Sequence, residues 1–200
     1  MKNFGLIGCL LFIITTIIGG YLFPNYSHIS NLISESYAVD APYNFQLRFF
    51  GYIPSAIFTG IFVLYFNSKT PKSTLKTLAC ILILISYSFA TLICAIFNCD
   101  VGCNPNFVNP SLSQVIHNLS GSITYLIMPF AILLIGLEFK KFGDSNFYKS
   151  CIFLFLISLF FIIILFNNFD SEYKGLIQRV IEITFILWFV FASKALKKSY

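Results

Sequence analysis

The chain has 200 residues, of which 58% are hydrophobic and 10% are charged, and its mean hydropathy is +0.83. A soluble domain is about one-quarter charged, so this composition excludes a soluble globular protein, which could not cover its surface with polar groups. The net charge of +5 does not indicate nucleic-acid binding, because the basic residues lie between apolar runs instead of forming one patch. We therefore expect an integral membrane protein without a nucleic-acid partner.

Six apolar runs follow one another along the chain. Each approaches the length of about 20 residues that a helix needs to cross the hydrocarbon core of a bilayer. The runs are continuous rather than alternating, which favours helices over barrel strands. The sequence therefore predicts one all-α domain over residues 1–200, an integral membrane bundle of six transmembrane helices. These helices are expected at 4–23, 49–66, 78–97, 115–137, 148–166 and 176–196.

The first run begins after a basic residue, Lys2, as a signal peptide does. Its apolar stretch is too long for a signal peptide, however, and no A-x-A cleavage site follows it. A lipoprotein-like box ends on Cys9, but only five residues precede that box, too few for the apolar region of such a signal. We therefore expect 4–23 to remain in the protein as a transmembrane helix.

Basic residues distinguish the two sides of the predicted bundle. Ten of the thirteen lie on one side, namely Lys2, Lys69, Lys72, Lys76, Lys140, Lys141, Lys149, Lys194, Lys197 and Lys198. The other side has only Arg48, Lys174 and Arg179. Cytoplasmic segments carry the excess of Lys and Arg, so both termini are predicted to lie in the cytoplasm.

The first outer segment, 24–47, is long for a connection between two helices. The apolar residues that recur in it at helical spacing are Ile29, Leu32, Ile33 and Tyr37. Glu35 lies on the opposite side, Ser27 can cap the turn, and Pro42 can end it. We predict a short amphipathic helix here, which either covers the bundle as a lid or only tethers two helices at the interface.

The second outer segment contains two cysteines, Cys99 and Cys103, on either side of Gly102. The predicted topology places them in an oxidising compartment, which favours a local disulfide. A zinc site that adds His28, His117 or Asp100 is the alternative, but no second paired-ligand motif supports it. We therefore expect no metal and no cofactor.

Polar residues inside the predicted helices gather toward the outer side, and such residues are costly in a membrane. Gln178, Arg179 and Glu182 share one face of the sixth helix by their spacing. Similar stripes occur at Gln114, His117, Asn118, Gly121 and Tyr125 in the fourth helix and at Arg48, Tyr52, Ser55 and Thr59 in the second. The stripes predict a polar cavity open to the outside. Alternatively, Arg179 and Glu182 pair with each other and hold the bundle together without a ligand.

Several segments together resemble a bacterial family of six-helix membrane proteins known as domain of unknown function 998. They are 30–35 with Ala41-Pro42, Cys99–Cys103, His117, Gly175 to Arg179, and Trp188. The resemblance covers essentially the whole chain, although Val39-Asp40 stands where the family usually has small residues. It implies a six-helix protein of the bacterial inner membrane, distantly similar to autophagy-modulator-type proteins linked loosely to membrane lipids. It implies no reaction.

The leading hypothesis is a protein that binds or senses a lipid headgroup or small polar ligand, with membrane lipids as partners. The expected ligand-binding residues are Arg179, Gln178, Glu182, His117, Asn118, Arg48 and Glu35. Arg179 would hold an anionic group, since its fork suits phosphate or carboxylate, and Asp100 would lie at the rim. A hydrolase or transferase is the first alternative, with His117, Glu182 and Asp100 as catalytic candidates, although no nucleophile motif supports it. The second alternative is a structural protein that packs through Gly51, Ser55 and Thr59.

Overall fold

The computed structural model describes residues 1–196, which are predominantly helical and contain no β-strand. Six helical segments in this part of the chain are long and apolar enough to cross a membrane. They are Phe4–Leu22, Asn44–Lys69, Thr74–Ile96, Leu112–Lys141, Ser145–Asn167 and Lys174–Ala195. The predicted all-α membrane bundle with six candidate spanning helices is therefore confirmed.

Four of the segments are single helices, α1 (Phe4–Leu22), α6 (Leu112–Lys141), α7 (Ser145–Asn167) and α8 (Lys174–Ala195). The second segment comprises α2 (Asn44–Leu47), the π-helical turn η2 (Arg48–Tyr52) and α3 (Ile53–Lys69). The third comprises α4 (Thr74–Ile83), the π-helical turn η3 (Leu84–Phe89) and α5 (Ala90–Ile96). A π turn widens a helix and is frequent near functional sites. Both of these turns lie next to the candidate functional site.

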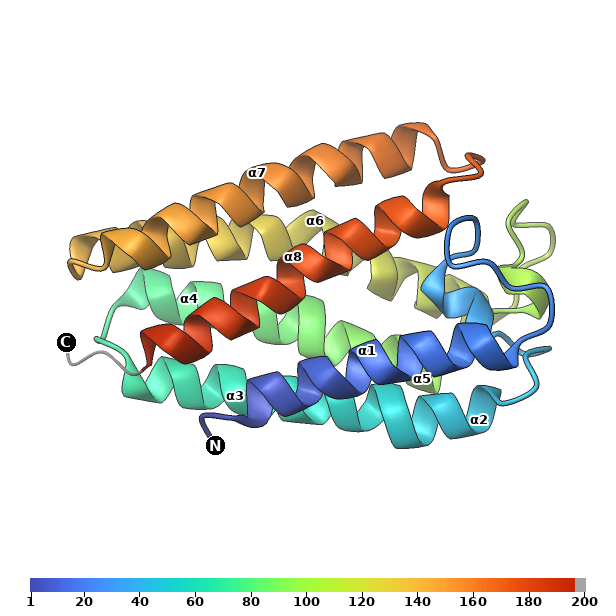
Figure 1. Ribbon diagram of the computed structural model, residues 1–200, viewed down its shortest axis with the longest axis horizontal. Coiled ribbons are helices and arrows are strands. Elements are labelled where there is room, and N and C mark those ends of the chain that lie inside the picture. The colour runs from blue at the N-terminus through green and yellow to red at the C-terminus, as the bar shows by residue number, and fades with distance from the viewer. Residues whose placement is uncertain (197–200) are drawn as a thin grey trace.

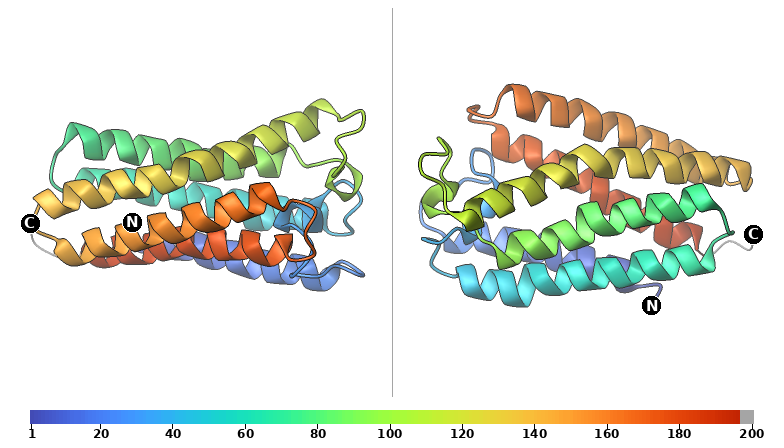
Figure 2. Two further views of the ribbon diagram at one scale, coloured as in Figure 1. Left: turned by 90° about the horizontal axis from the view of Figure 1, so that it is seen from above. Right: turned by 180° about the vertical axis from the view of Figure 1, so that it is seen from behind.

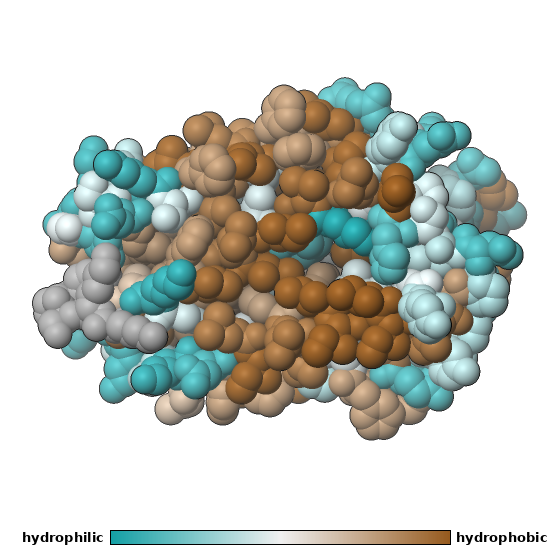
Figure 3. Space-filling view, viewed as in Figure 1, coloured by the Kyte–Doolittle hydropathy of each residue, from teal (hydrophilic) through white to brown (hydrophobic). Residues whose placement is uncertain are grey.

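The helices run antiparallel, so the start of α1 and the end of α8 lie at the same end of the bundle (Figure 1). We call this the terminal end; it also contains the connections 70–73 and 142–144. The opposite end, the loop end, is formed by 23–43, 97–111 and 168–173. A hydrophobic band separates the more hydrophilic ends, as expected for a chain that spans a membrane (Figure 3).

The terminal half of the bundle is filled by aromatic side chains. The ring of Phe66 lies 5.6 Å from that of Phe139 and 5.8 Å from that of Trp188, and all three residues are fully buried. The buried Lys76 there caps the end of α3, because its Nζ donates to the carbonyl oxygens of Asn67 at 2.7 Å and Thr70 at 3.2 Å. This half therefore has little space for a ligand.

The small-residue face predicted for the second segment packs against α1 of the same chain. Ser55 donates a hydrogen bond to the carbonyl oxygen of Gly8 at 2.8 Å. A Cβ on Gly51 would lie only 2.2 Å from Thr15 Oγ1, so the two helices touch directly at this point. The face is consequently used inside the protein rather than left open for a partner.

The first loop forms a shorter helix than predicted, the 3-10 helix η1 (Ile33–Tyr37). Ile29, expected on the same apolar stripe, is 51% exposed. The helix begins late because side chains hold its first amide groups: Leu32 N donates to Glu35 Oε1 at 2.9 Å, and Ile33 N donates to Gln178 Oε1 at 2.7 Å. A side chain from α8 therefore determines where the loop turns.

Candidate functional site

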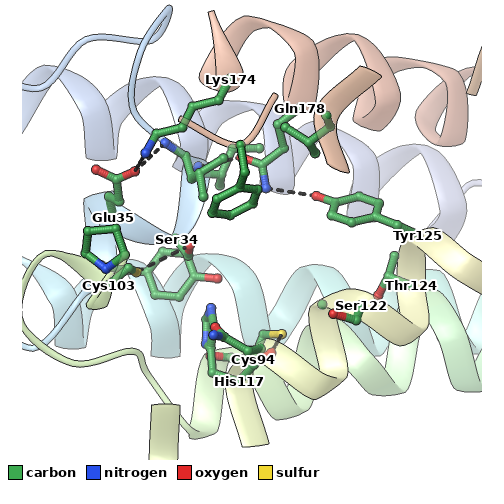
Figure 4. Close-up of a pocket in the computed structure, with 18 of the residues that line it drawn as sticks. Ser34, Glu35, Cys94, Cys103, His117, Ser122, Thr124, Tyr125, Lys174 and Gln178 are labelled. Carbon is green, nitrogen blue, oxygen red and sulfur yellow. Dashed lines mark hydrogen bonds and ion pairs between the residues drawn. The ribbon is translucent and has the colours of Figure 1, made fainter. Parts of the chain in front are cut away.

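A cavity of about 510 Å³ lies at the loop end of the bundle. Its walls come from α1, η2, α5, α6, the end of α7, α8 and the three loops of the loop end, and Figure 4 shows polar residues that face it. From the set expected to bind a ligand, the structure places His117, Asn118, Gln178, Glu182 and Glu35 around it. The predicted stripes of the fourth and sixth helices thus meet at one cavity.

His117 rises from α6 into this cavity and is only 6% exposed (Figure 4). Its Nδ1 lies 2.8 Å from the carbonyl oxygen of Phe97 and 3.1 Å from that of Cys94. Carbonyl oxygens can only accept, so Nδ1 carries the hydrogen and Nε2 keeps a free lone pair. The backbone at the end of α5 therefore presents His117 to the cavity as a hydrogen-bond acceptor or base.

Glu182 is the deepest charged group of the cavity wall and is 8% exposed. A chain of hydrogen bonds reaches it, because Gln178 Nε2 donates to the Tyr125 hydroxyl at 2.8 Å and that hydroxyl donates to Glu182 Oε1 at 3.0 Å. The other carboxylate oxygen, Oε2, is buried without a partner at hydrogen-bond geometry among the described residues, and the Tyr87 hydroxyl, which is also buried without such a partner, interacts with the same carboxylate. A buried carboxylate oxygen without a partner is costly, so this atom is suited to receive a donor from a ligand.

An ion pair stands at the mouth of the cavity. Lys174 Nζ lies 3.9 Å from Glu35 Oε1, and the same carboxylate also accepts hydrogen bonds from Leu32 N and the Asn31 amide (Figure 4). Lys174 is the one Lys or Arg on the cavity wall within the described chain. The cavity wall therefore carries no net positive charge.

Arg179 lies outside the cavity and holds the first loop on α8. Its Nη1 donates to the carbonyl oxygens of Asn31 and Gly175, both at 2.9 Å. Its Nη2 donates to the Tyr26 hydroxyl at 2.6 Å and to His28 Nδ1 at 3.0 Å. One residue turns a helix by about 100°, so Gln178 and Glu182 face the cavity while Arg179 faces the loop. Arg179 and Glu182 consequently do not pair with each other, and that alternative is wrong.

This contact changes the acid–base properties of the first loop. Burial lowers the pKa of His28, and the nearby Arg179 guanidinium lowers it further. Burial raises the pKa of Tyr26, while the charge of Arg179 and its hydrogen bond act in the opposite direction. His28 is therefore held neutral, with Nδ1 as the acceptor.

Two other residues from the predicted set connect parts of the loop end without lining the cavity. Arg48 donates to the carbonyl oxygens of Ala95 at 2.5 Å and Ile96 at 2.8 Å, which caps the end of α5. Asp100 accepts hydrogen bonds from Ser111 N at 3.0 Å and Ser111 Oγ at 2.5 Å, and these bonds lower the pKa of its carboxyl. Both therefore have structural roles in this fold.

A disulfide joins Cys99 and Cys103, whose Cα atoms are 4.8 Å apart, as the sequence predicted. Cys103 Sγ lies 3.4 Å from Ser34 Oγ, so the disulfide braces the first loop at the cavity mouth. Within residues 1–196, no group of three or more His, Cys, Asp or Glu side chains could hold a metal ion.

Sequence reasoning missed three parts of the cavity wall. Lys174 lines the wall, and its only signal in the sequence is that basic residues are few on the outer side. Tyr37 was placed on an interfacial stripe, but it is buried with its ring 4.7 Å from that of Tyr52 and 6.0 Å from that of His117. The end of α7, with Leu165 and Phe166, carries no polar signal because it supplies an apolar wall.

The profile of a family described as "Protein of unknown function (DUF998)" matches residues 6–193. No curated protein and no solved structure matches the chain.

Proposed function

Because the chain belongs to the DUF998 family, whose description names no activity, we propose its function from the site: it is a multi-pass membrane protein that binds a lipid headgroup or small polar ligand. The binding site is the loop-end cavity. The observation that carries this proposal is the pairing of a volume of about 510 Å³ with unused acceptors on its wall, Glu182 Oε2 and His117 Nε2.

The volume and the chemistry of the wall both support binding. Small-molecule sites are commonly 300–1,000 Å³, mostly apolar, with a few convergent polar groups. Here Tyr37 and Phe12 supply apolar surface, whereas Gln178 and Tyr125 hold Glu182 in position.

The distribution of basic residues supports an orientation in which the loop end faces the outside of a bacterial inner membrane and both termini lie in the cytoplasm. Lys69, Lys72, Lys140 and Lys141 flank the two connections of the terminal end. Lys197 and Lys198, which also entered this prediction, lie outside the described residues. In this orientation the disulfide lies in the oxidising compartment, which favours its formation.

Native mass spectrometry of the gently extracted, non-reduced protein tests the proposal. We expect a discrete adduct that is weakened in Glu182→Gln and in His117→Gln, because the first change removes the charge of the carboxylate and the second removes the ring nitrogen of the histidine. Lys149 is an exposed lysine at the terminal end, so Lys149→Gln is the matched control and should keep the adduct. A bare protein in every preparation would contradict ligand binding and favour the structural alternative.

A second function, a hydrolase or transferase with His117 as general base, is favoured by one observation. The two carbonyl contacts at Nδ1 fix the tautomer that a base requires, with Nε2 directed to the cavity. In this case the bound molecule would be turned over, and His117→Gln would abolish turnover while the adduct accumulates. An adduct that remains chemically unchanged on prolonged incubation with wild-type protein would contradict this second function.

A further inference from the structure

The helices α6 and α7 are in contact toward the terminal end and diverge toward the loop end (Figures 1 and 2). A Cβ on Gly136 of α6 would lie 2.6 Å from Cys151 Cβ of α7, which shows how closely the helices approach there. Four turns nearer the loop end, a Cβ on Gly121 would meet nothing within 4 Å. The two helices therefore leave an open space between them in the loop-end half of the bundle.

The cavity extends into this space. Asn118, Gly121 and Ser122 of α6 and Leu165 and Phe166 of α7 all belong to its wall. Asn118 is exposed, and Phe166 is 48% exposed, so residues on both helices belong to the cavity wall and to the outer surface of the bundle. These positions lie within the membrane-spanning segments. The cavity wall therefore reaches the side of the bundle between α6 and α7.

The charges of the wall favour one kind of headgroup. Lys174 already pairs with Glu35, whereas Glu182 lies eight residues farther along α8, about 12 Å deeper by helical rise. The unused atoms at depth, Glu182 Oε2 and His117 Nε2, are acceptors and repel the oxygens of an anion. A positively charged group with N–H donors can pair with the Glu182 carboxylate and offsets the cost of burying it.

We propose that the occupant of the cavity is an amphiphile with a primary amine headgroup, which enters from the bilayer between α6 and α7 and donates its N–H groups to Glu182 and His117. This inference rests on the proposed function, since it names the class of ligand and its route. It replaces the anionic group that the sequence suggested for Arg179, because the Arg179 guanidinium is held by the first loop.

Lipid competition measured by native mass spectrometry tests the inference. The full-length protein is mixed with equal amounts of phosphatidylethanolamine, phosphatidylcholine and phosphatidylglycerol that carry the same acyl chains. Phosphatidylcholine is the sharpest comparison because its nitrogen is charged but has no N–H donor. We expect roughly tenfold preference for phosphatidylethanolamine over both others, the factor that one well-formed hydrogen bond can supply.

Two variants examine the headgroup site and the lateral route separately. Glu182→Gln should remove the preference, and Gly121→Trp should fill the space between α6 and α7 and slow or prevent lipid uptake. Leu126→Trp is the matched control: it lies on the same helix, is 60% exposed and does not line the cavity. The melting temperature of each variant shows whether it remains folded.

Each contrary outcome overturns a defined part of the inference. Equal binding of phosphatidylethanolamine and phosphatidylcholine, or preference for phosphatidylglycerol, would overturn the amine while leaving ligand binding intact. Soluble phosphoethanolamine that binds as well as the lipid, together with unchanged uptake in Gly121→Trp, would overturn the lateral route. Absence of any lipid or soluble adduct would overturn the proposed function itself.

Discussion

Arg179 Nη2 lies 3.0 Å from His28 Nδ1, which joins the start of α8 to the first loop. An arginine guanidinium is always charged and can only donate, so His28 must accept at Nδ1 and remain neutral. Beside this contact, Leu176 N donates to the carbonyl oxygen of Ile29 at 2.9 Å. A neutral histidine is therefore part of the contact that holds the first loop on α8.

Acidification should release the first loop. The pKa of His28 is lowered from its ordinary value of 6.5 by burial and by Arg179, so the folded form binds the proton less readily than the unfolded chain. Its contribution to stability is therefore complete above the unfolded pKa and is lost as the pH falls through the folded pKa. Hydrogen exchange at the Leu176 amide should accelerate over this range while the bundle stays folded.

The control for this pH dependence is His28→Gln, which keeps an acceptor but does not titrate. We expect the acceleration at Leu176 below pH 6.5 to disappear in this variant. If the variant shows the same pH dependence as the wild type, another group controls the loop.

Replacing Arg179 should affect stability more than ligand binding. Arg179→Gln removes three hydrogen bonds between α8 and the first loop and one to Gly175 within α8, and hydrogen bonds to charged groups contribute about 1.5–3 kcal/mol each at most. We expect a loss of about 2–4 kcal/mol, measured by thermal unfolding against Lys149→Gln, with the cavity adduct retained. A lost adduct with unchanged stability would instead support the anion-binding role expected from the sequence.

Two glycine substitutions should have opposite effects. A Cβ on Gly175 would lie 2.3 Å from the carbonyl oxygen of Asn31, and this backbone atom cannot rotate away. Gly175→Ala should therefore destabilise the protein by about 1–3 kcal/mol, as overpacking does. Gly121→Ala enters open space within a helix and should be neutral or stabilise by up to about 1 kcal/mol. Equal melting temperatures for the two variants would show that the loop does not pack on α8 as described.

Thiol counting should reveal the disulfide. Of the six cysteines, Cys99 and Cys103 are bonded, while Cys9, Cys80, Cys94 and Cys151 are free. Alkylation of the denatured, non-reduced chain should therefore modify four thiols, and all six after reduction. Loop-closure entropy for so short a loop gives the bond about 2 kcal/mol, so reduction should also lower the melting temperature. Six modified thiols before reduction would contradict the bond.

Several features follow from local sequence. The six apolar runs are long enough to span a membrane in any packing arrangement, so the helix count does not depend on tertiary contacts. Cys99 and Cys103 are so close in the chain that a bond between them requires only a turn. The stripe containing His117 and Asn118 likewise follows from helical spacing alone, and both residues line the cavity.

Tertiary packing determined which residues of the polar stripes face the cavity. The spacing of Gln178, Arg179 and Glu182 gives them one broad face, but the first loop packs against part of it and takes Arg179 away from the cavity. The start of η1 depends on a bond between Ile33 and Gln178, which are 145 residues apart in the chain. Local hydropathy therefore determined which segments cross the membrane. The direction of each polar side chain depended instead on which distant segment covers it, because hydrogen-bond partners are supplied by packing and not by chain neighbours.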